Sequence, residues 1–386
     1  MSTWSLQRYK HIGRNQGFPD DVINTSAEVL DRIHKKNPSV AKILTLRHLS
    51  ELSDISYLYL RSAVHNNQNL YKKAVLKKQS KPQRAKRTIY IPTSELADLQ
   101  RWLHHNVLRQ CDVHPRSFAY SQGSHPIFAA SEHSACEWLI KLDITDFFHS
   151  ISESSVYKVF RGIGYTKLLS FELARLTTIR SAYDYLPRWH DGECDYQSIP
   201  FYDDSVSGVL PQGAPTSPML SNLVAYDLDE RLEAIAHRIG FCYTRYADDI
   251  AFSTERKLAK SDILKIKNEM LGAIRRSGFM PNEFKTKIAG PGSRKIVLGL
   301  VVNNIRPTLT RQFKDDIRKH FYFLESSKHG IPEHAKHCRM STSALYEFIE
   351  GKAIWAKKVE PAYGRHILQR LHNLPWPPID YSAKRY

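Results

Sequence analysis

The sequence has few cysteines and no long apolar run. Its five cysteines are scattered and form neither a paired Cys-x-x-Cys metal motif nor the spacing of a disulfide framework. No apolar stretch approaches the roughly 20 residues that a membrane-spanning helix needs. The first residues also lack the apolar segment of a secretory signal peptide. These absences argue against a disulfide-bonded secreted domain and against a membrane protein. We therefore expect a cytoplasmic protein with no membrane partner.

Acidic residues are also scarce relative to basic ones. There are 56 Lys and Arg residues against 39 Asp and Glu, which gives a formal net charge of +17. In other respects the 386 residues, 42% hydrophobic and 25% charged, are typical of a globular chain with two or three domains or subdomains. Because no membrane segment is expected, the positive charge favours a nucleic-acid partner.

The pattern of apolar residues divides the chain into regions. Helical spacing predicts a helical N-terminal region over residues 1–70, which Asn37-Pro38-Ser39 interrupts. Residues 71–87 are the most basic stretch and contain no acid. Residues 181–207 have no periodicity and are rich in Tyr, Asp, Pro and Ser, which predicts a loop insertion. Residues 304–386 are predicted to be helical and basic.

Two adjacent carboxylates lie in Tyr246-Ala247-Asp248-Asp249, between two aromatic-rich apolar stretches. The flanking stretches predict strands, so the pair is expected at the tip of a hairpin. Side-by-side negative charges repel each other unless a cation lies between them and a further ligand. A solvated Asp-Asp turn is the alternative for a pair that stands alone.

A further carboxylate, Asp143, ends the apolar stretch Trp138-Leu-Ile-Lys-Leu-Asp-Ile144. This stretch predicts a strand, where a carboxylate is costly unless it is paired or binds a metal. A helix N-cap is the alternative. Together with Asp248 and Asp249, Asp143 would supply the oxygen ligands that Mg²⁺ prefers. Two such ions, about 3.5–4 Å apart, hold the attacking and leaving oxygens of a phosphoryl transfer.

A turn rich in proline and glycine lies between these acidic segments, in Leu210-Pro-Gln-Gly-Ala-Pro-Thr-Ser-Pro218. The prolines stiffen the turn, and Gly213 allows a close approach or a backbone conformation that other residues avoid. The amide of Gln212 is suited to contact a base or sugar edge. On composition alone, this segment is equally consistent with an ordinary loop.

The order of the three segments resembles the palm of the right-hand polymerases, and in particular the reverse transcriptases. The Leu-Pro-Gln-Gly-Ala-Pro-Thr-Ser-Pro and Tyr-Ala-Asp-Asp motifs are similar to those of the bacterial retron type. The resemblance implies an α+β fold, with fingers and an antiparallel palm sheet over residues 71–303 and a helical thumb over 304–386. It also implies an RNA-directed DNA polymerase that uses two Mg²⁺ ions.

The resemblance further implies roles for single residues. Asp143 and Asp248 would be the main metal ligands, with Asp249 beside them. Phe148 would pack against the sugar and exclude a 2′-hydroxyl, although a core aromatic is the alternative. The remaining implied contacts are to the nucleotide: Arg87 would clamp the triphosphate, Asp146 and Phe147 would line its site partly through their backbone, Gln212 and Gly213 would border the incoming nucleotide and template base, and Lys285 would neutralise or protonate the pyrophosphate.

Contacts with RNA are less well defined by the resemblance. Lys81 and Lys86 would assist the triphosphate clamp or grip template phosphates. His133 would contact the family's structured RNA, but a buried, satisfied histidine is equally consistent. The retron motif Asn-Ala-x-x-His stands here as Ala129-Ala130-Ser-Glu-His133, and Val-Thr-Gly stands as Val297-Leu298-Gly299. These departures leave the RNA specificity open.

Retron enzymes, by resemblance, copy a cognate non-coding RNA from one of its own 2′-hydroxyls, which consumes deoxynucleoside triphosphates and yields branched RNA–DNA (msDNA). This product serves antiphage defence with an effector protein. The alternatives are another bacterial defence or group II intron-like reverse transcriptase and a non-catalytic RNA-binding scaffold; the three carboxylates argue against the scaffold. His334-x-x-His337-Cys338 offers no clear fourth ligand, so no zinc site is expected there.

Overall fold

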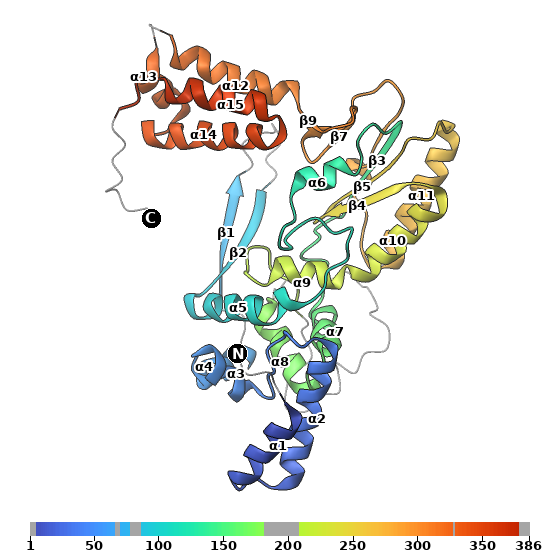
Figure 1. Cartoon of the computed structure of the whole chain (residues 1–386), viewed down its shortest axis with the longest axis vertical. Coiled ribbons are helices and arrows are strands. Elements are labelled where there is room, and N and C mark those ends of the chain that lie inside the picture. The colour runs from blue at the N-terminus through green and yellow to red at the C-terminus, as the bar shows by residue number, and fades with distance from the viewer. Residues whose placement is uncertain (1–4, 66–69, 78–85, 181–207, 327–328, 378–386) are drawn as a thin grey trace. The chain divides into compact units, whose positions relative to one another are not determined.

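The computed structural model describes residues 5–65, 70–77, 86–180, 208–326 and 329–377 (Figure 1). The chain divides into two compact units. The first comprises Met1–Ser124, Lys141–Ile250 and Leu258–Lys287, and the second comprises His125–Ile140, Ala251–Lys257 and Ile288–Tyr386. Within the described ranges, no helix is long and apolar enough to cross a membrane.

The first unit begins with helices, as the apolar spacing of the N-terminal residues predicts. One of them, α2, buries Ile23, Ala27, Leu30 and Ile33, which recur every three or four residues and therefore share one face of the helix. It ends directly before the Asn-Pro-Ser break. The helices of this stretch are α1 (Leu6–Asn15), α2 (Asp20–Lys36), α3 (Leu46–Ser53) and α4 (Tyr57–His65).

Two antiparallel strands follow. Strand β1 (Tyr71–Lys77) pairs with β2 (Lys86–Pro92) in a register that sets Tyr71 opposite Pro92. The lysines of β1 interrupt the alternation of apolar and polar residues that identifies a strand in the sequence. Helix α5 (Ser94–Asn106) buries Gln100, which donates a hydrogen bond to the Tyr71 hydroxyl at 2.8 Å.

The central sheet has the strand order β4-β5-β3-β6. Its strands are β3 (Trp138–Asp143), β4 (Cys242–Tyr246), β5 (Asp249–Thr254) and β6 (Lys287–Ala289). Every residue of β5 except the first is buried, which accounts for its continuous run of apolar and small side chains. Helix α10 (Tyr226–Ile239) packs against β4 and against α11 (Lys260–Arg276) (Figure 1).

Helices α7 (Glu153–Ile163), α8 (Lys167–Thr177) and α9 (Ser217–Val224) complete the first unit. Apolar residues recur at helical spacing from Met219 to Ile239, but Ala225 interrupts the helix and separates α9 from α10. The predicted loop insertion, residues 181–207, lies outside the described residues. Its flanks are joined by a backbone bridge, in which Ile179 and Val209 exchange hydrogen bonds of 2.9 and 3.0 Å.

The second unit contains α6 (Pro126–Ser131) and a small antiparallel sheet of β7 (Ile296–Val297), β8 (Leu300–Val301) and β9 (Thr308–Leu309). The turn between β7 and β8 is Leu298-Gly299, with φ of 47° and 81°, values that glycine adopts readily and leucine rarely.

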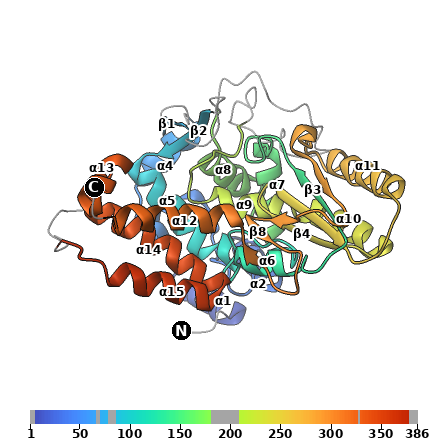
Figure 2. The same cartoon turned by 90° about the horizontal axis from the view of Figure 1, so that it is seen from above.

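The C-terminal part of the second unit is a helical bundle. It consists of α12 (Arg311–Leu324), α13 (Gly330–Cys338), α14 (Thr342–Val359) and α15 (Pro361–His372), and α14 and α15 lie side by side (Figures 1 and 2). Gly364 is required at this crossing, because a Cβ atom there would lie 2.1 Å from the Lys357 backbone nitrogen. Apolar side chains including Ile317, Phe321 and Leu345 form the core of the bundle. Mixed helices and antiparallel sheets confirm the predicted α+β class.

Candidate active site

The acidic pair lies at the tip of a hairpin, as predicted. Ala247 and Asp248 connect β4 to β5, and Ala247 has a φ of 56°, which is uncommon for a residue with a Cβ atom. The backbone N–H of Ile144 donates to the carbonyl of Asp248 at 3.1 Å. Because Ile144 directly follows Asp143, this bond fixes the tip of the hairpin beside the end of β3.

A buried arginine, Arg245, holds the hairpin in place through hydrogen bonds. Arg245 is fully buried and donates hydrogen bonds of 2.7 and 2.6 Å to Asp229 on α10, which is also fully buried. The Tyr243 hydroxyl donates to the same carboxylate at 2.6 Å. Burial opposes the charge of Arg245, but Asp229 outweighs it and raises the pKa of the guanidinium. Arg245 also donates to the carbonyl of Ala247 at 3.2 Å, so the ion pair holds the turn directly.

The role of Arg245 was not predicted from the sequence. The available signal was a charged residue in the strand Cys242–Tyr246, which is otherwise apolar or aromatic apart from Thr244. A charge at such a position requires a partner. The partner, Asp229, is 16 residues away on a different element, so local pattern does not identify it.

Asp143 is the buried end of β3 and is paired with Lys285. The ammonium of Lys285 donates to both carboxylate oxygens of Asp143, at 3.0 and 2.9 Å. Lys285 follows α11, in the short 3₁₀ helix Glu283–Lys285, and the N–H of Asn282 anchors this segment to the carbonyl of Asp143 at 2.7 Å. The hydrogen bond to Asp143 raises the pKa of Lys285; burial opposes this effect, and the negative charges of the aspartates add to it.

The three predicted metal ligands form a region of excess negative charge. Burial raises the pKa of the Asp249 carboxyl, and the charges of Asp248 and Asp143 raise it further, whereas Lys141 and Lys285 lower it. Among the described residues, the carboxylate oxygens of Asp143, Asp248 and Asp249 do not all lie within 4.8 Å of one another. Even so, three carboxylates that destabilise one another's charge are a donor set that suits a hard divalent cation.

The Pro-Gln-Gly turn is docked on strand β2. The N–H of Tyr90 donates to the carbonyl of Gln212 at 2.8 Å. Gly213 has a φ of 114°, and a Cβ atom there would lie 2.4 Å from Cγ2 of Ile89 and 2.9 Å from the carbonyl oxygen of Tyr90. The structure therefore requires glycine at this position. The turn leads directly into α9, where the Ser217 hydroxyl donates to the carbonyl of Pro211 at 2.6 Å.

The residues that follow Asp143 differ in exposure. Asp146 is exposed, with a φ of 45°, and its carbonyl accepts a hydrogen bond from the N–H of Ser150 at 2.8 Å. Phe147 is buried, with its ring 5.7 Å from the Arg245 guanidinium, so only its backbone is available to a nucleotide. Phe148 is half-buried, and its ring centroid lies 6.3 Å from that of Tyr120. Part of its surface is therefore accessible, as a sugar contact requires.

The predicted RNA contacts receive little support. Lys81 lies outside the described residues, and Lys86 and Arg87 belong to β2 but their side chains are not among those described. His133 is fully buried, and its Nδ1 lies 2.7 Å from the hydroxyl of Ser253. This placement matches the alternative of a satisfied, buried histidine.

Comparison with known proteins gives matches to one family. The family described as reverse transcriptase (RNA-dependent DNA polymerase) matches residues 75–302. The chain is 28% identical to the retron Ec86 reverse transcriptase of Escherichia coli over 346 residues, 89% of this chain and 98% of that protein. It is 30% identical to the retron Ec73 reverse transcriptase of Escherichia coli over 305 residues, 74% of this chain and 86% of that protein.

A solved structure shows a weaker likeness. A telomerase from Candida albicans, in complex with a fragment of telomeric RNA, has a TM-score of 0.42 and 11% identity. The match covers 91% of this chain and 60% of that one.

Proposed function

Because the chain belongs to the retron-type reverse transcriptases, and so is an RNA-directed DNA polymerase with a right-hand polymerase fold, we propose that it copies a cognate structured non-coding RNA into single-stranded DNA. Synthesis starts from a 2′-hydroxyl of that RNA and gives a branched RNA–DNA product. The observation that carries the proposal is the hydrogen bond from Ile144 to Asp248, which sets the hairpin carboxylates beside Asp143.

Asp143 and Asp248, with Asp249 beside them, would hold two Mg²⁺ ions. When bound, such ions lower the pKa of the attacking hydroxyl and neutralise the pyrophosphate. Arg245 and Asp229 fix the backbone of the hairpin, and the bond to Ile144 fixes its position against β3. The backbone that carries the carboxylates is therefore fixed in advance, so only the side chains have to turn onto the ions.

Lys285 would act on the leaving group. Its pKa is raised mainly by the hydrogen bond to Asp143, so the side chain is a firmly protonated counter-ion in this arrangement. If the Asp143 carboxylate turns away from Lys285 to another partner, the hydrogen bond that mainly raises the pKa of Lys285 is lost. The ammonium is then more acidic and has a proton to donate to the pyrophosphate oxygen.

The nucleotide would lie beside the junction of the Pro-Gln-Gly turn and the strand that bears Arg87. The hydrogen bond between Tyr90 and Gln212 joins these two segments. In this arrangement Gln212 and Gly213 border the base, Arg87 clamps the triphosphate, and Asp146 and the backbone of Phe147 line the phosphates. Phe148, which is half-buried, packs against the sugar and excludes a 2′-hydroxyl.

The partners would be deoxynucleoside triphosphates, the cognate RNA, the DNA product and an effector protein in antiphage defence in the cytoplasm. The net charge of +17 supports the nucleic-acid partners. Lys81 and Lys86 remain candidates for template phosphate contacts. A contact between His133 and RNA would need this buried side chain to become accessible.

The product distinguishes the retron function from related ones. The protein would be expressed together with its flanking genomic DNA, and the nucleic acid that copurifies would be analysed with RNase and a 2′–5′ debranching enzyme. We expect single-stranded DNA joined through a 2′–5′ bond to RNA. The Asp248→Asn, Asp249→Asn double variant should lack this product, whereas Asp262→Asn, at an exposed carboxylate of α11, should retain it. Linear products alone would contradict the priming proposal and favour another bacterial reverse transcriptase.

A further inference from the structure

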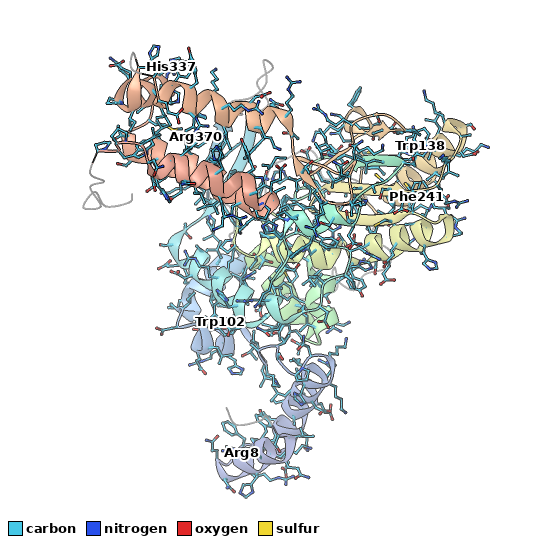
Figure 3. All side chains as sticks on the ribbon, turned by 45° about the horizontal axis from the view of Figure 1, so that its top comes forward. Arg8, Trp102, Trp138, Phe241, His337 and Arg370 are labelled. Atoms are coloured by element: carbon cyan, nitrogen blue, oxygen red, sulfur yellow. The ribbon has the colours of Figure 1, made fainter. Side chains whose placement is uncertain are left out.

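A cluster of nitrogen and sulfur ligands lies between two helices of the C-terminal bundle, within the second unit. His320 lies on α12, and His334 and Cys338 lie one turn apart on α13. Their ligand atoms all fall within 4.8 Å of one another. The sequence offers His334, His337 and Cys338 without a clear fourth ligand and therefore predicts no zinc site here. The structure instead adds His320 from α12 to His334 and Cys338. His337 is exposed on α13 (Figure 3), and its ring centroid lies 6.4 Å from that of His334.

The distances in this cluster are close to those around a tetrahedral zinc ion. His320 Nδ1 lies 2.9 Å from His334 Nε2, and Cys338 Sγ lies 3.7 Å from the same nitrogen. With Zn–N bonds of about 2.05 Å and Zn–S bonds of about 2.3 Å, tetrahedral angles place two nitrogens about 3.3 Å apart and a nitrogen and a sulfur about 3.6 Å apart. Small side-chain adjustments would therefore bring all three atoms onto one ion.

Hydrogen bonding within the cluster leaves His334 poorly satisfied. This side chain is 4% exposed, and its Nε2 is the atom that both His320 and Cys338 approach. Its other nitrogen, Nδ1, is buried and has no hydrogen-bond partner among the described residues. A neutral imidazole has one N–H and one lone pair, so a single nitrogen cannot serve two partners equally. A cation that accepts the lone pair of Nε2 would resolve this competition.

The charges around the cluster are compatible with a metal ion. Burial lowers the pKa of His320 and of His334, which keeps both imidazoles neutral, as a ligand must be. Burial raises the pKa of the Cys338 thiol, so a bound metal would have to displace its proton. Asp316, one turn before His320, is ion-paired with Lys352, and Lys319 also lies near the cluster. The Cys338 thiolate would supply one negative charge to the ion, since the charge of Asp316 is already paired with Lys352.

We propose that His320, His334 and Cys338 bind a zinc ion, with water as the fourth ligand, which joins α12 to α13. Two imidazoles and a thiolate are ligands that zinc prefers. The ion would stabilise the small helical bundle by linking two of its helices. Its role is separate from the polymerase carboxylates, which offer only oxygen ligands.

The test measures metal directly rather than polymerase activity. Full-length protein purified from zinc-supplemented cells and dialysed without chelator should contain one zinc per chain by mass spectrometry. Replacement by Co²⁺ should give the near-ultraviolet band of a cobalt–thiolate bond and the visible bands of tetrahedral cobalt. Wild-type protein that holds no stoichiometric zinc and shows no thiolate band would overturn the proposal and leave a hydrogen-bonded His-His-Cys cluster.

Two variants assign the ligands. Cys338→Ser should abolish the thiolate band, and His320→Gln should keep the band but weaken cobalt binding. Supporting groups alone change metal affinity by about 10–100-fold, so we expect the loss of a ligand to weaken zinc binding at least about 100-fold. Cys111→Ser, at a free cysteine of the first unit, is the matched control and should bind as the wild type does. Unchanged zinc affinity in folded Cys338→Ser protein would also overturn the proposal.

Discussion

Replacement of Arg245 by methionine should destabilise the protein strongly, because it leaves a buried charge without its partner. Both Arg245 and Asp229 have no exposed side-chain surface. Breaking such a pair costs about 3–5 kcal/mol, whereas whole domains are stable by about 5–15 kcal/mol. For a unit of this size, each kcal/mol corresponds to about 2–4 °C, so the melting temperature should fall by about 6–20 °C. Thermal unfolding followed by circular dichroism measures this change.

A double variant separates stability from the position of the hairpin. Arg245→Met together with Asp229→Leu removes both charges and replaces them with apolar side chains, which should recover most of the lost stability. The carbonyl of Ala247 still lacks its donor in this variant, so the carboxylates next to it are less firmly held. Misplacement by about 1 Å reduces catalysis by about 100-fold, so we expect kcat for primer extension to fall about 10- to 100-fold.

The matched control is Arg238→Met on the same helix as Asp229. Arg238 is 61% exposed and pairs with Glu269, and exposed pairs contribute at most about 1 kcal/mol. Its loss should leave both melting temperature and kcat nearly unchanged. An Arg245→Met protein as stable as this control would refute the energetic reasoning, and full kcat in the stable double variant would refute the positioning role.

Three further predictions concern the site. Asp249→Asn should raise the melting temperature of chelator-treated protein at pH 7 while it abolishes extension. Burial raises the pKa of Asp249 in the folded protein above its ordinary value of 3.8, and the charges of Asp248 and Asp143 raise it further. The fold therefore loses stability as the pH rises from 3.8 through the raised pKa, and an unchanged melting temperature would contradict this cost of ionising Asp249. Gly213→Ala should cost at least about 1 kcal/mol and lower extension, since it places a Cβ atom against Ile89 at positive φ. The control Gly162→Ala, in the last turn of α7 with open space beside it, should be neutral or stabilising; equal effects of the two would exclude the steric explanation. Phe148→Ala should increase ribonucleotide incorporation relative to deoxynucleotides, and unchanged selectivity would identify Phe148 as a core residue.

The parts of the site that depend on local pattern could be predicted from the sequence. The strand before Asp143 and the Asp248 hairpin follow from short apolar runs and a turn, and both are present. Strand β1 was missed because its lysines mask the alternation on which a strand prediction depends. The sequence predicts that Gly213 allows a close approach. It does not identify Ile89 as the neighbour, because the two residues are more than 100 positions apart in the chain.

Side-chain clusters that join separate elements could not be predicted. Asp229 and Arg245 are paired across a helix and a strand, and nothing in either local pattern identifies the other. The motif of α13 offers His334, His337 and Cys338 without a clear fourth ligand, so the sequence predicts no zinc site there. Helical geometry directs His334 and Cys338, four residues apart, to the same face. The third member, His320, comes from α12 and is recognisable only when the two helices are packed together.

The central claim is that Asp143, Asp248 and Asp249 carry out RNA-directed DNA synthesis, and single-turnover extension tests it most directly. Purified protein would be mixed with Mg²⁺, deoxynucleotides and a DNA primer on an RNA template. We expect the wild type and Asp262→Asn to extend the primer, and Asp248→Asn, Asp249→Asn to bind the RNA with equal affinity but add no nucleotide. Extension by the double variant at the wild-type rate would contradict the assignment of these carboxylates.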